Sequence, residues 1–415
     1  MRIDFQTGTL LLLIASVVAM VTKRLRLPYS VGLVSAGIAL AAIPYGPHLI
    51  LTKTLIYDGL LPPLLFEAAY NIHWERLRRN ALVVGVLVTA GVAISGAATA
   101  AGMHFLAHWQ WLAALTFGAL IAATDPVSVI AIFHEAKAHG RLLLLIEAES
   151  LLNDGTASVA FAVVTAFAIG HQLSSGGVLL MLLKTMGGGV ACGAAVGVGA
   201  LILTGRTDDH LVEVTCTTVA AYGAFLLADA DGMSGLLATI TAGLVMRNFE
   251  RLDGISPRGK EAVSNFWQYA AFIANSMIFL LIGTQQRNQN FASIWIPILV
   301  AIGVVLAARA FAVYTCCGFF HWSALRVAPH QQHILVWGGL RGAVALALAL
   351  GLPQQFPMHN TIVTVSFAVV AFSIFIQGLT LAPVLRRAGE IPPKPQPERP
   401  KEEARSGPRA GSIRQ

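Results

Sequence analysis

Long apolar runs alternate with short polar patches along almost the whole chain. A helix rises about 1.5 Å per residue, so roughly 20 apolar residues cross the hydrocarbon core of a bilayer. Runs of that length predict about thirteen transmembrane helices joined by short loops. They begin near Thr7, Pro28, Thr54, Asn80, Trp109, Arg141, Gly176, Leu211, Met233, Ala262, Phe291, His330 and Asn360, and the last ends near Leu385.

The composition excludes a soluble fold. Of the 415 residues, 56% are hydrophobic and 12% are charged, whereas about a quarter are charged in a soluble domain. The four cysteines lie in apolar runs without metal-ligand spacing, so they indicate small buried side chains and no disulfide framework. The first apolar run follows no signal-peptide pattern and is interpreted as a retained span.

The net charge of +7 is explained by its distribution, so we expect no nucleic-acid partner. With the C-terminus cytoplasmic and the N-terminus outside, most basic residues fall on the inner side, in clusters around Lys23, Arg76 and Arg258 and in the tail. We therefore expect a multi-pass protein of the plasma (inner) membrane. Residues 1–388 form the predicted transmembrane domain, and residues 389–415 a disordered basic cytoplasmic tail that also has the charge to touch anionic lipid.

Ionisable residues at bilayer depth are costly and therefore mark functional sites. Glu67 lies late in the third span, where it either contributes to a site or forms an interfacial pair with Arg76 or Arg78. Asp125 precedes Pro126 inside an apolar stretch, and proline disfavours helix at the residue before it. The helix should break there and line an ion path, or Asp125 should cap the helix that restarts behind it.

The sixth span carries the densest polar run, from Glu147 to Asp154. Ser150 and Asp154 are four residues apart and share one helix face, and Glu149 and Asn153 share the neighbouring face. A second intramembrane charge, Arg341, lies between glycines in the twelfth span, so a second helix break is expected there. A buried Arg requires a membrane carboxylate as its partner.

The two expected breaks occupy corresponding positions. If the seventh span is a linker, spans one to six and eight to thirteen form two six-helix halves of opposite orientation, and each break lies in the fifth helix of its half. This pattern is typical of inverted repeats whose broken helices cross at the midplane. The predicted fold is an all-α polytopic membrane protein with about thirteen helices in two inverted repeats.

Four motifs, in order and on the expected spans, resemble the first monovalent cation:proton antiporter family, the sodium/proton exchangers, in its bacterial NhaP-like form related to the animal exchangers. The likeness covers roughly residues 5–388. Its motifs are Phe66-Glu-Ala-Ala-Tyr-Asn71, Ala123-Thr-Asp-Pro126, Glu149-Ser-Leu-Leu-Asn-Asp154 and Gly339-Leu-Arg-Gly-Ala-Val344.

The resemblance implies a cation and proton site around Asp154, the carboxylate that binds either substrate. It implies that Ser150, Thr124 and Glu67 complete the Na+ ligands, and that Asn153 stands where electrogenic relatives have a second Asp.

The resemblance also implies that Asp125 supports Asn153 and Thr124, and that Glu149 and Arg341 form a structural ion pair. It further implies a six-helix core domain that moves against a dimerising domain, and hence a homodimer. Ala148 and Ser128 depart from the family's usual residues without removing a ligand.

The expected activity is secondary antiport of Na+ or Li+ for H+, serving intracellular pH and sodium homeostasis, with no enzymatic step and no cofactor. Oxygen ligands suit a hard monovalent cation, and one shared carboxylate predicts electroneutral one-for-one exchange. K+/H+ exchange on the same fold is the alternative. A cation channel would need a continuous pore, and a membrane hydrolase a nucleophile and base sharing a span, which the histidine positions do not offer.

Overall fold

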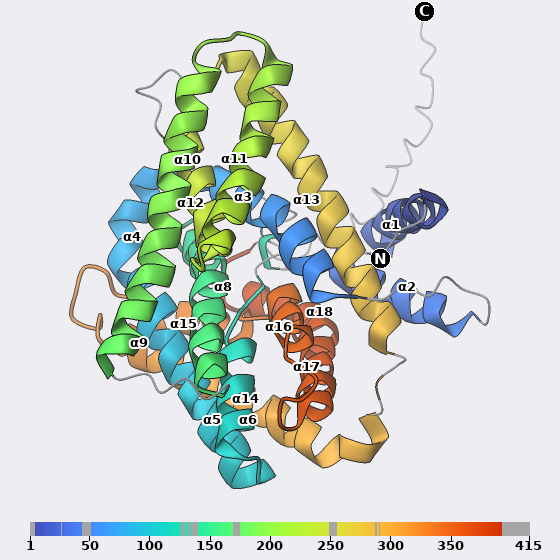
Figure 1. Ribbon diagram of the computed structural model, residues 1–415. Helices are drawn as coiled ribbons and strands as arrows, with labels where there is room; N and C mark the ends of the chain where they lie inside the picture. The colour runs from blue at the N-terminus through green and yellow to red at the C-terminus, as the bar shows by residue number, and fades with distance from the viewer. Residues whose placement is uncertain are drawn as a thin grey trace, which may run out of the picture.

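In the computed structural model, the described residues are 5–25, 27–43, 51–125, 129–131, 133, 140–168, 175–248, 255–286, 289 and 291–391. Every regular element within those ranges is helical (Figure 1). Pro126, Ser128 and most of the predicted disordered tail, residues 392–415, lie outside them.

The helices follow one another with short connections, and several run through a π-helical turn into the next element. Their bounds are α1 Phe5–Leu25, α2 Tyr29–Ala42, η1 Leu55–Leu60, α3 Leu61–Asn71, α4 Trp74–Val86, η2 Leu87–Gly91, α5 Val92–Ala107, α6 Trp111–Ile121, α8 Arg141–Ala168, α9 Ser175–Leu182, η3 Leu183–Gly187, α10 Gly188–Thr204, α11 His210–Ala230, α12 Gly235–Asn248, α13 Pro257–Gln286, η5 Phe291–Ile294, α14 Trp295–Gly318, α15 Pro329–Trp337, α16 Ala343–Leu350, α17 His359–Phe372, η6 Ser373–Gln377 and α18 Gly378–Arg387.

Eight helices in the described ranges are long and apolar enough to cross a membrane. Each predicted span also has helix within a few residues of its expected start, although α2 and α6 are short and α15 and α16 share one predicted span. The all-helical membrane fold is therefore confirmed, and the count of thirteen crossings stays a prediction.

The helices form two packed groups. In one, α1, α2, α3 and α10 to α13 pack against one another, and in the other α4 to α6, α8 and α14 to α18 do so. In the first group, α2 and α13 meet at two glycines: a Cβ at Gly37 would lie 2.2 Å from the Leu280 carbonyl oxygen and 2.9 Å from the Gly283 Cα. Small residues permit such close helix packing in a membrane.

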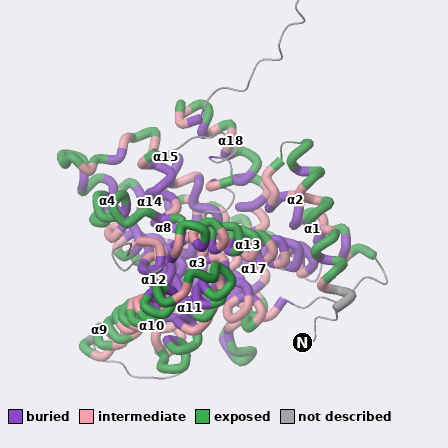
Figure 2. Tube along the Cα trace, turned by 90° about the horizontal axis from the view of Figure 1, so that it is seen from above, coloured by how far each residue is buried: buried purple, intermediate pink, exposed green. Residues whose placement is uncertain are grey.

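Exposed positions lie mainly on the outer helices, and buried positions gather toward the middle of the molecule (Figure 2). The exposed side chains include large apolar ones such as Leu13 and Met20 of α1 and Leu180 of α9. Exposed apolar surface of this extent is incompatible with water and fits contact with lipid.

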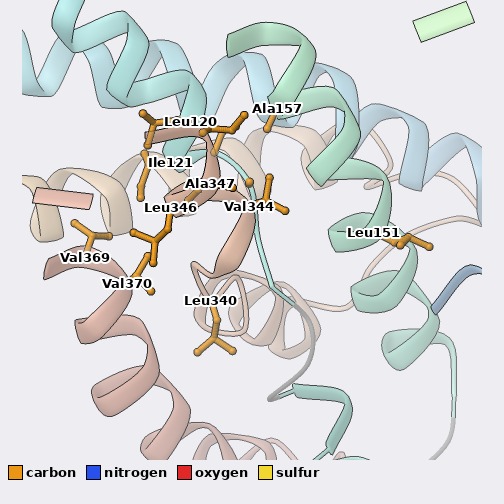
Figure 3. Packing of buried hydrophobic residues seen from close by; sticks show 14 of the residues in the cluster. Leu120, Ile121, Leu151, Ala157, Leu340, Val344, Leu346, Ala347, Val369 and Val370 are labelled. Carbon is orange, nitrogen blue, oxygen red and sulfur yellow. The ribbon is translucent and has the colours of Figure 1, made fainter. Parts of the chain in front are cut away.

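Two interrupted helices cross in the centre, as the sequence predicts. One helix, α6, ends at Ile121, and the other is interrupted between Trp337 of α15 and Ala343 of α16. The two non-helical stretches meet as an antiparallel bridge in which the Asp125 backbone N–H donates to the Leu340 carbonyl at 2.7 Å. Around the crossing, the end of α6 packs with α16 and α17 through apolar side chains (Figure 3).

Candidate cation site

A cavity of about 290 Å³ lies between the two helix groups. One wall is built by α3 and α13, and the other by the stretch 123–125, α8 and α16. Most of the lining is apolar, so the few polar side chains are the groups that can bind an ion in the cavity. These polar side chains are Glu67, Thr124, Asp125, Asp154, Gln268 and Asn275.

Three carboxylates from three different elements therefore share one cavity. Asp154 comes from the middle of α8 and is 8% exposed, Glu67 comes from α3, and Asp125 comes from the break after α6. Neighbouring carboxylates repel one another, and a bound cation or proton relieves that repulsion. The arrangement is chemically suited to hold a monovalent cation among oxygen ligands.

Behind the cavity wall, hydroxyl and amide groups brace the broken helix. The Thr124 hydroxyl donates to Ser150 Oγ at 3.1 Å, and Asn153 Nδ2 donates to Thr124 Oγ1 at 3.1 Å and to the Ala122 carbonyl at 3.0 Å. All these side chains are buried, whereas only Thr124 among them lines the cavity. Ser150 and Asn153 thus hold the unwound backbone and Thr124 in place from α8.

Asp125 lies close to the second broken helix. A Cβ at Gly342 would come within 2.7 Å of Asp125 Oδ2, so only glycine lets the carboxylate approach the backbone there. The support of Asn153 and Thr124 by Asp125 stays a prediction, because the hydrogen bonds described above run from the Asn153 amide to the Ala122 carbonyl and the Thr124 hydroxyl.

Glu67 is braced by its own helix. Asn71 Nδ2 donates to Glu67 Oε1 at 2.6 Å, and the carboxylate lines the cavity. The alternative of an interfacial ion pair with Arg76 or Arg78 does not match this placement, since among the described residues the hydrogen-bond partner of Glu67 is Asn71.

The predicted ion pair between Glu149 and Arg341 is wrong, because Glu149 pairs with a different arginine. Glu149 binds Arg309 of α14 in a bidentate pair, with Nη1 to Oε1 at 2.7 Å and Nη2 to Oε2 at 2.8 Å. Arg309 Nη2 also donates to the Leu335 carbonyl at 3.0 Å. Both side chains are buried, and a bidentate pair of this kind is the strongest geometry that an arginine and a carboxylate form.

Arg341 binds backbone carbonyls instead. Its Nη1 donates to the carbonyls of Ala122 at 2.8 Å and Ala123 at 3.1 Å. The last carbonyls of a helix lack intrahelical partners and carry the negative end of its dipole. The carbonyls at the break after α6 therefore compensate the positive charge of Arg341, a role that we expected a carboxylate to fill.

Two residues of the cavity were not predicted from the sequence. Gln268 and Asn275 lie on α13, seven residues apart and hence on one helix face, and both line the cavity opposite Asp154. The available signal was their two amide side chains within a mostly apolar span.

A side-chain clasp from η6 closes the break in the second interrupted helix. Gln377 Nε2 donates to the Trp337 carbonyl at 3.1 Å, and the Arg341 backbone N–H donates to Ser373 Oγ at 3.1 Å. The Ser373 hydroxyl in turn donates to Gln377 Oε1. The clasp thus satisfies one carbonyl at the end of α15 and one N–H before α16.

Replacing Gln377 by Leu should lower thermal stability, because the half-buried Trp337 carbonyl loses its partner at a cost of about 1 kcal/mol. Heat-induced unfolding of the purified protein in detergent measures the effect. Gln110, exposed before α6, provides the control, and Gln110→Leu should leave the melting temperature nearly unchanged. Equal losses in the two variants would contradict the role of the clasp.

The chain is similar to known proteins over most of its length. The family described as "Sodium/hydrogen exchanger, transmembrane" matches residues 10–387. The Na(+)/H(+) antiporter ApNhaP of Aphanothece halophytica is 38% identical over 369 residues, covering 88% of this chain and 70% of its own. The Na(+)/H(+) antiporter NhaP of Pseudomonas aeruginosa is 33% identical, covering 80% of this chain and 81% of its own.

Among solved structures, the sodium proton antiporter MjNhaP1 of Methanocaldococcus jannaschii matches with a TM-score of 0.70 and 22% identity, covering 92% of this chain and 95% of its own. That match confirms the predicted antiporter fold. Since the family match spans nearly the whole membrane region, the chain belongs to the sodium/hydrogen exchanger family, as its four motifs predict.

Proposed function

We propose that this protein exchanges Na+ for H+ one for one across the plasma membrane, with Asp154 as the carboxylate for which the two substrates compete. The observation that carries the proposal is the buried Asp154 facing a cavity that Thr124, Glu67 and Asp125 also line. Hydroxyl and carboxylate oxygens are the ligands that a hard cation prefers.

The exchange follows from the cost of moving a charge through a low-dielectric barrier. With Na+ or H+ bound, the charge of Asp154 is neutralised and the site is able to cross, whereas the bare carboxylate is held back. Because the two helix groups meet at the cavity, a movement of the group that carries α8 against the group that carries α13 would expose Asp154 to each side in turn.

The hydroxyl and amide groups behind the cavity wall keep the shape of the site during that movement. Ser150 and Asn153 travel with Asp154 on α8 and hold Thr124 through 3.1 Å contacts. In this proposal Thr124 offers oxygen to the cation from the cavity wall. Ser150, which the sequence suggested as a further ligand, does not line the cavity and acts by holding Thr124 in place. The Glu149–Arg309 pair ties α8 to α14, so that both helices move as one body.

We further propose that the C-terminus lies in the cytoplasm and the N-terminus outside, and that the protein serves pH and sodium homeostasis as a homodimer. Excess basic charge on the predicted cytoplasmic side supports the orientation. The cavity oxygens do not by themselves distinguish Na+ from Li+ or K+.

Reconstituted vesicles test the activity. With a preset pH gradient, addition of Na+ should dissipate the gradient, and parallel additions of Li+ and K+ rank the three cations. A gradient that collapses only with K+ would replace the proposal by K+/H+ exchange. A cation current without coupled proton movement would indicate a channel.

Charge balance provides a sharper prediction for the same vesicles. An amide carries no proton at neutral pH, so Asn153 beside Asp154 leaves one titrating group to both substrates. Each half-cycle then moves one positive charge, and Na+-driven proton flux should be independent of membrane potential. The measurement clamps the vesicles at several voltages with potassium and valinomycin. A rate or end-point gradient that shifts steadily with voltage would implicate Glu67 or Asp125 as a second acid.

A further inference from the structure

The α13 wall of the cavity carries a polar group that the exchange mechanism does not yet use. We infer that Asn275 is a cation-contacting residue, whose side-chain amide oxygen helps to capture Na+ opposite Asp154 and so sets the apparent affinity for the cation. This inference rests on the proposed exchange function and adds a ligand to it.

The placement of Asn275 indicates a role in binding. Its side chain is 8% exposed and lines the cavity. Among the residues that the structure describes, no other side chain or backbone group hydrogen-bonds to the Asn275 amide. The polar groups of a mostly buried side chain usually find a hydrogen-bond partner. An amide that faces a cavity and has no protein partner is therefore free to bind what enters the cavity.

The next residue shows the opposite arrangement. Ser276 is fully buried, and its hydroxyl lies 2.7 Å from the Tyr29 hydroxyl and donates to the Phe272 carbonyl. It does not line the cavity. On the side of α13 that packs against other helices, the buried Ser276 hydroxyl is thus hydrogen-bonded within the protein, whereas on the other side the Asn275 amide faces the cavity.

A neutral oxygen suits this position better than a further acid. An amide oxygen coordinates a hard cation without adding charge. The complex of Na+ with the Asp154 carboxylate therefore remains electrically neutral and able to cross. Asn275 belongs to the helix group that does not carry Asp154. Its contact with the cation is therefore made while the cavity is open and is given up when the two groups move.

Two substitutions and one matched control test the assignment in vesicles. Asn275→Leu keeps the size of the side chain and removes its oxygen, so the apparent KM for Na+ should rise about tenfold, equivalent to about 1.4 kcal/mol, at an unchanged maximal rate. Asn275→Asp adds a negative oxygen, so at alkaline pH the KM should fall. Ser276→Ala, on the adjacent residue outside the cavity, should leave the KM unchanged.

Opposite shifts of KM distinguish binding from a structural role, because damage to packing would lower the maximal rate in both Asn275 variants. An unchanged KM in Asn275→Leu, or a loss of rate in both variants without a change in KM, overturns the assignment while the wild-type exchange stands. A wild-type protein that shows no cation-driven proton flux overturns the proposed function, and the assignment of Asn275 with it.

Discussion

Replacing Asp154 by Asn should reduce Na+-driven proton flux to the level of protein-free vesicles while the protein still folds. The substitution keeps the shape of a buried side chain that is 8% exposed and removes the charge for which Na+ and H+ compete. An amide neither takes up a proton at neutral pH nor offers a charge to Na+. Reconstituted variant protein, tested with a preset pH gradient, gives the measurement.

The control for Asp154 is the same change at a carboxylate outside the cavity. Asp231 is exposed at the end of α11 and is not part of the cavity lining. Asp231→Asn should transport at the wild-type rate, and both variants should elute and melt like the wild type. Sodium-dependent dissipation of the gradient by Asp154→Asn would show that the competed-for group lies elsewhere.

The membrane environment made much of the fold predictable from local sequence. Only helices and closed barrels satisfy their backbone groups in lipid, so the length of an apolar run indicates a helix almost directly. The helix breaks were also predictable from local sequence. Proline and glycine are costly inside a continuous helix, so Pro126 and the glycines around Arg341 indicate places where the helix is interrupted. The crossing at Asp125 and Leu340 confirms the expected meeting of the two breaks.

The partners of the buried charges were not predictable in this way. The sequence shows two arginines inside spans, Arg309 and Arg341, and several carboxylates, but not which side chains face one another. The expected rule that a buried arginine needs a carboxylate failed for Arg341, because the carbonyls at the end of α6 serve instead. Backbone partners of this kind become visible only when the helices are assembled.

The cavity was equally hidden from the sequence. Its α13 wall comes from a span without acidic residues in its apolar part, so only the amides of Gln268 and Asn275 hinted at it. The placement of Ser150 and Asn153 behind the wall also depends on how α8 faces the stretch after α6. Helix periodicity assigns residues to a shared face, but it does not say which neighbour that face meets.

The ion pair between Glu149 and Arg309 should dominate the stability of the group that carries Asp154. Both partners are buried and the pair is bidentate, so the loss of either one leaves an uncompensated charge away from water. Such a loss typically costs about 3–5 kcal/mol. Glu149→Gln and Arg309→Met should therefore each lower expression and melting temperature strongly, and the double variant should recover part of the loss.

A second cycle with Arg341 in place of Arg309 distinguishes the two arginines. Arg341 donates to the carbonyls of Ala122 and Ala123, so its removal affects the helix break and leaves the Glu149–Arg309 pair intact. Losses from Glu149→Gln and Arg341→Met should be close to additive, whereas those from Glu149→Gln and Arg309→Met should couple strongly. Melting temperatures of the single and double variants in one detergent measure both cycles. Strong coupling in the Arg341 cycle, with additivity in the Arg309 cycle, would restore the pairing expected from the sequence and refute the one described here.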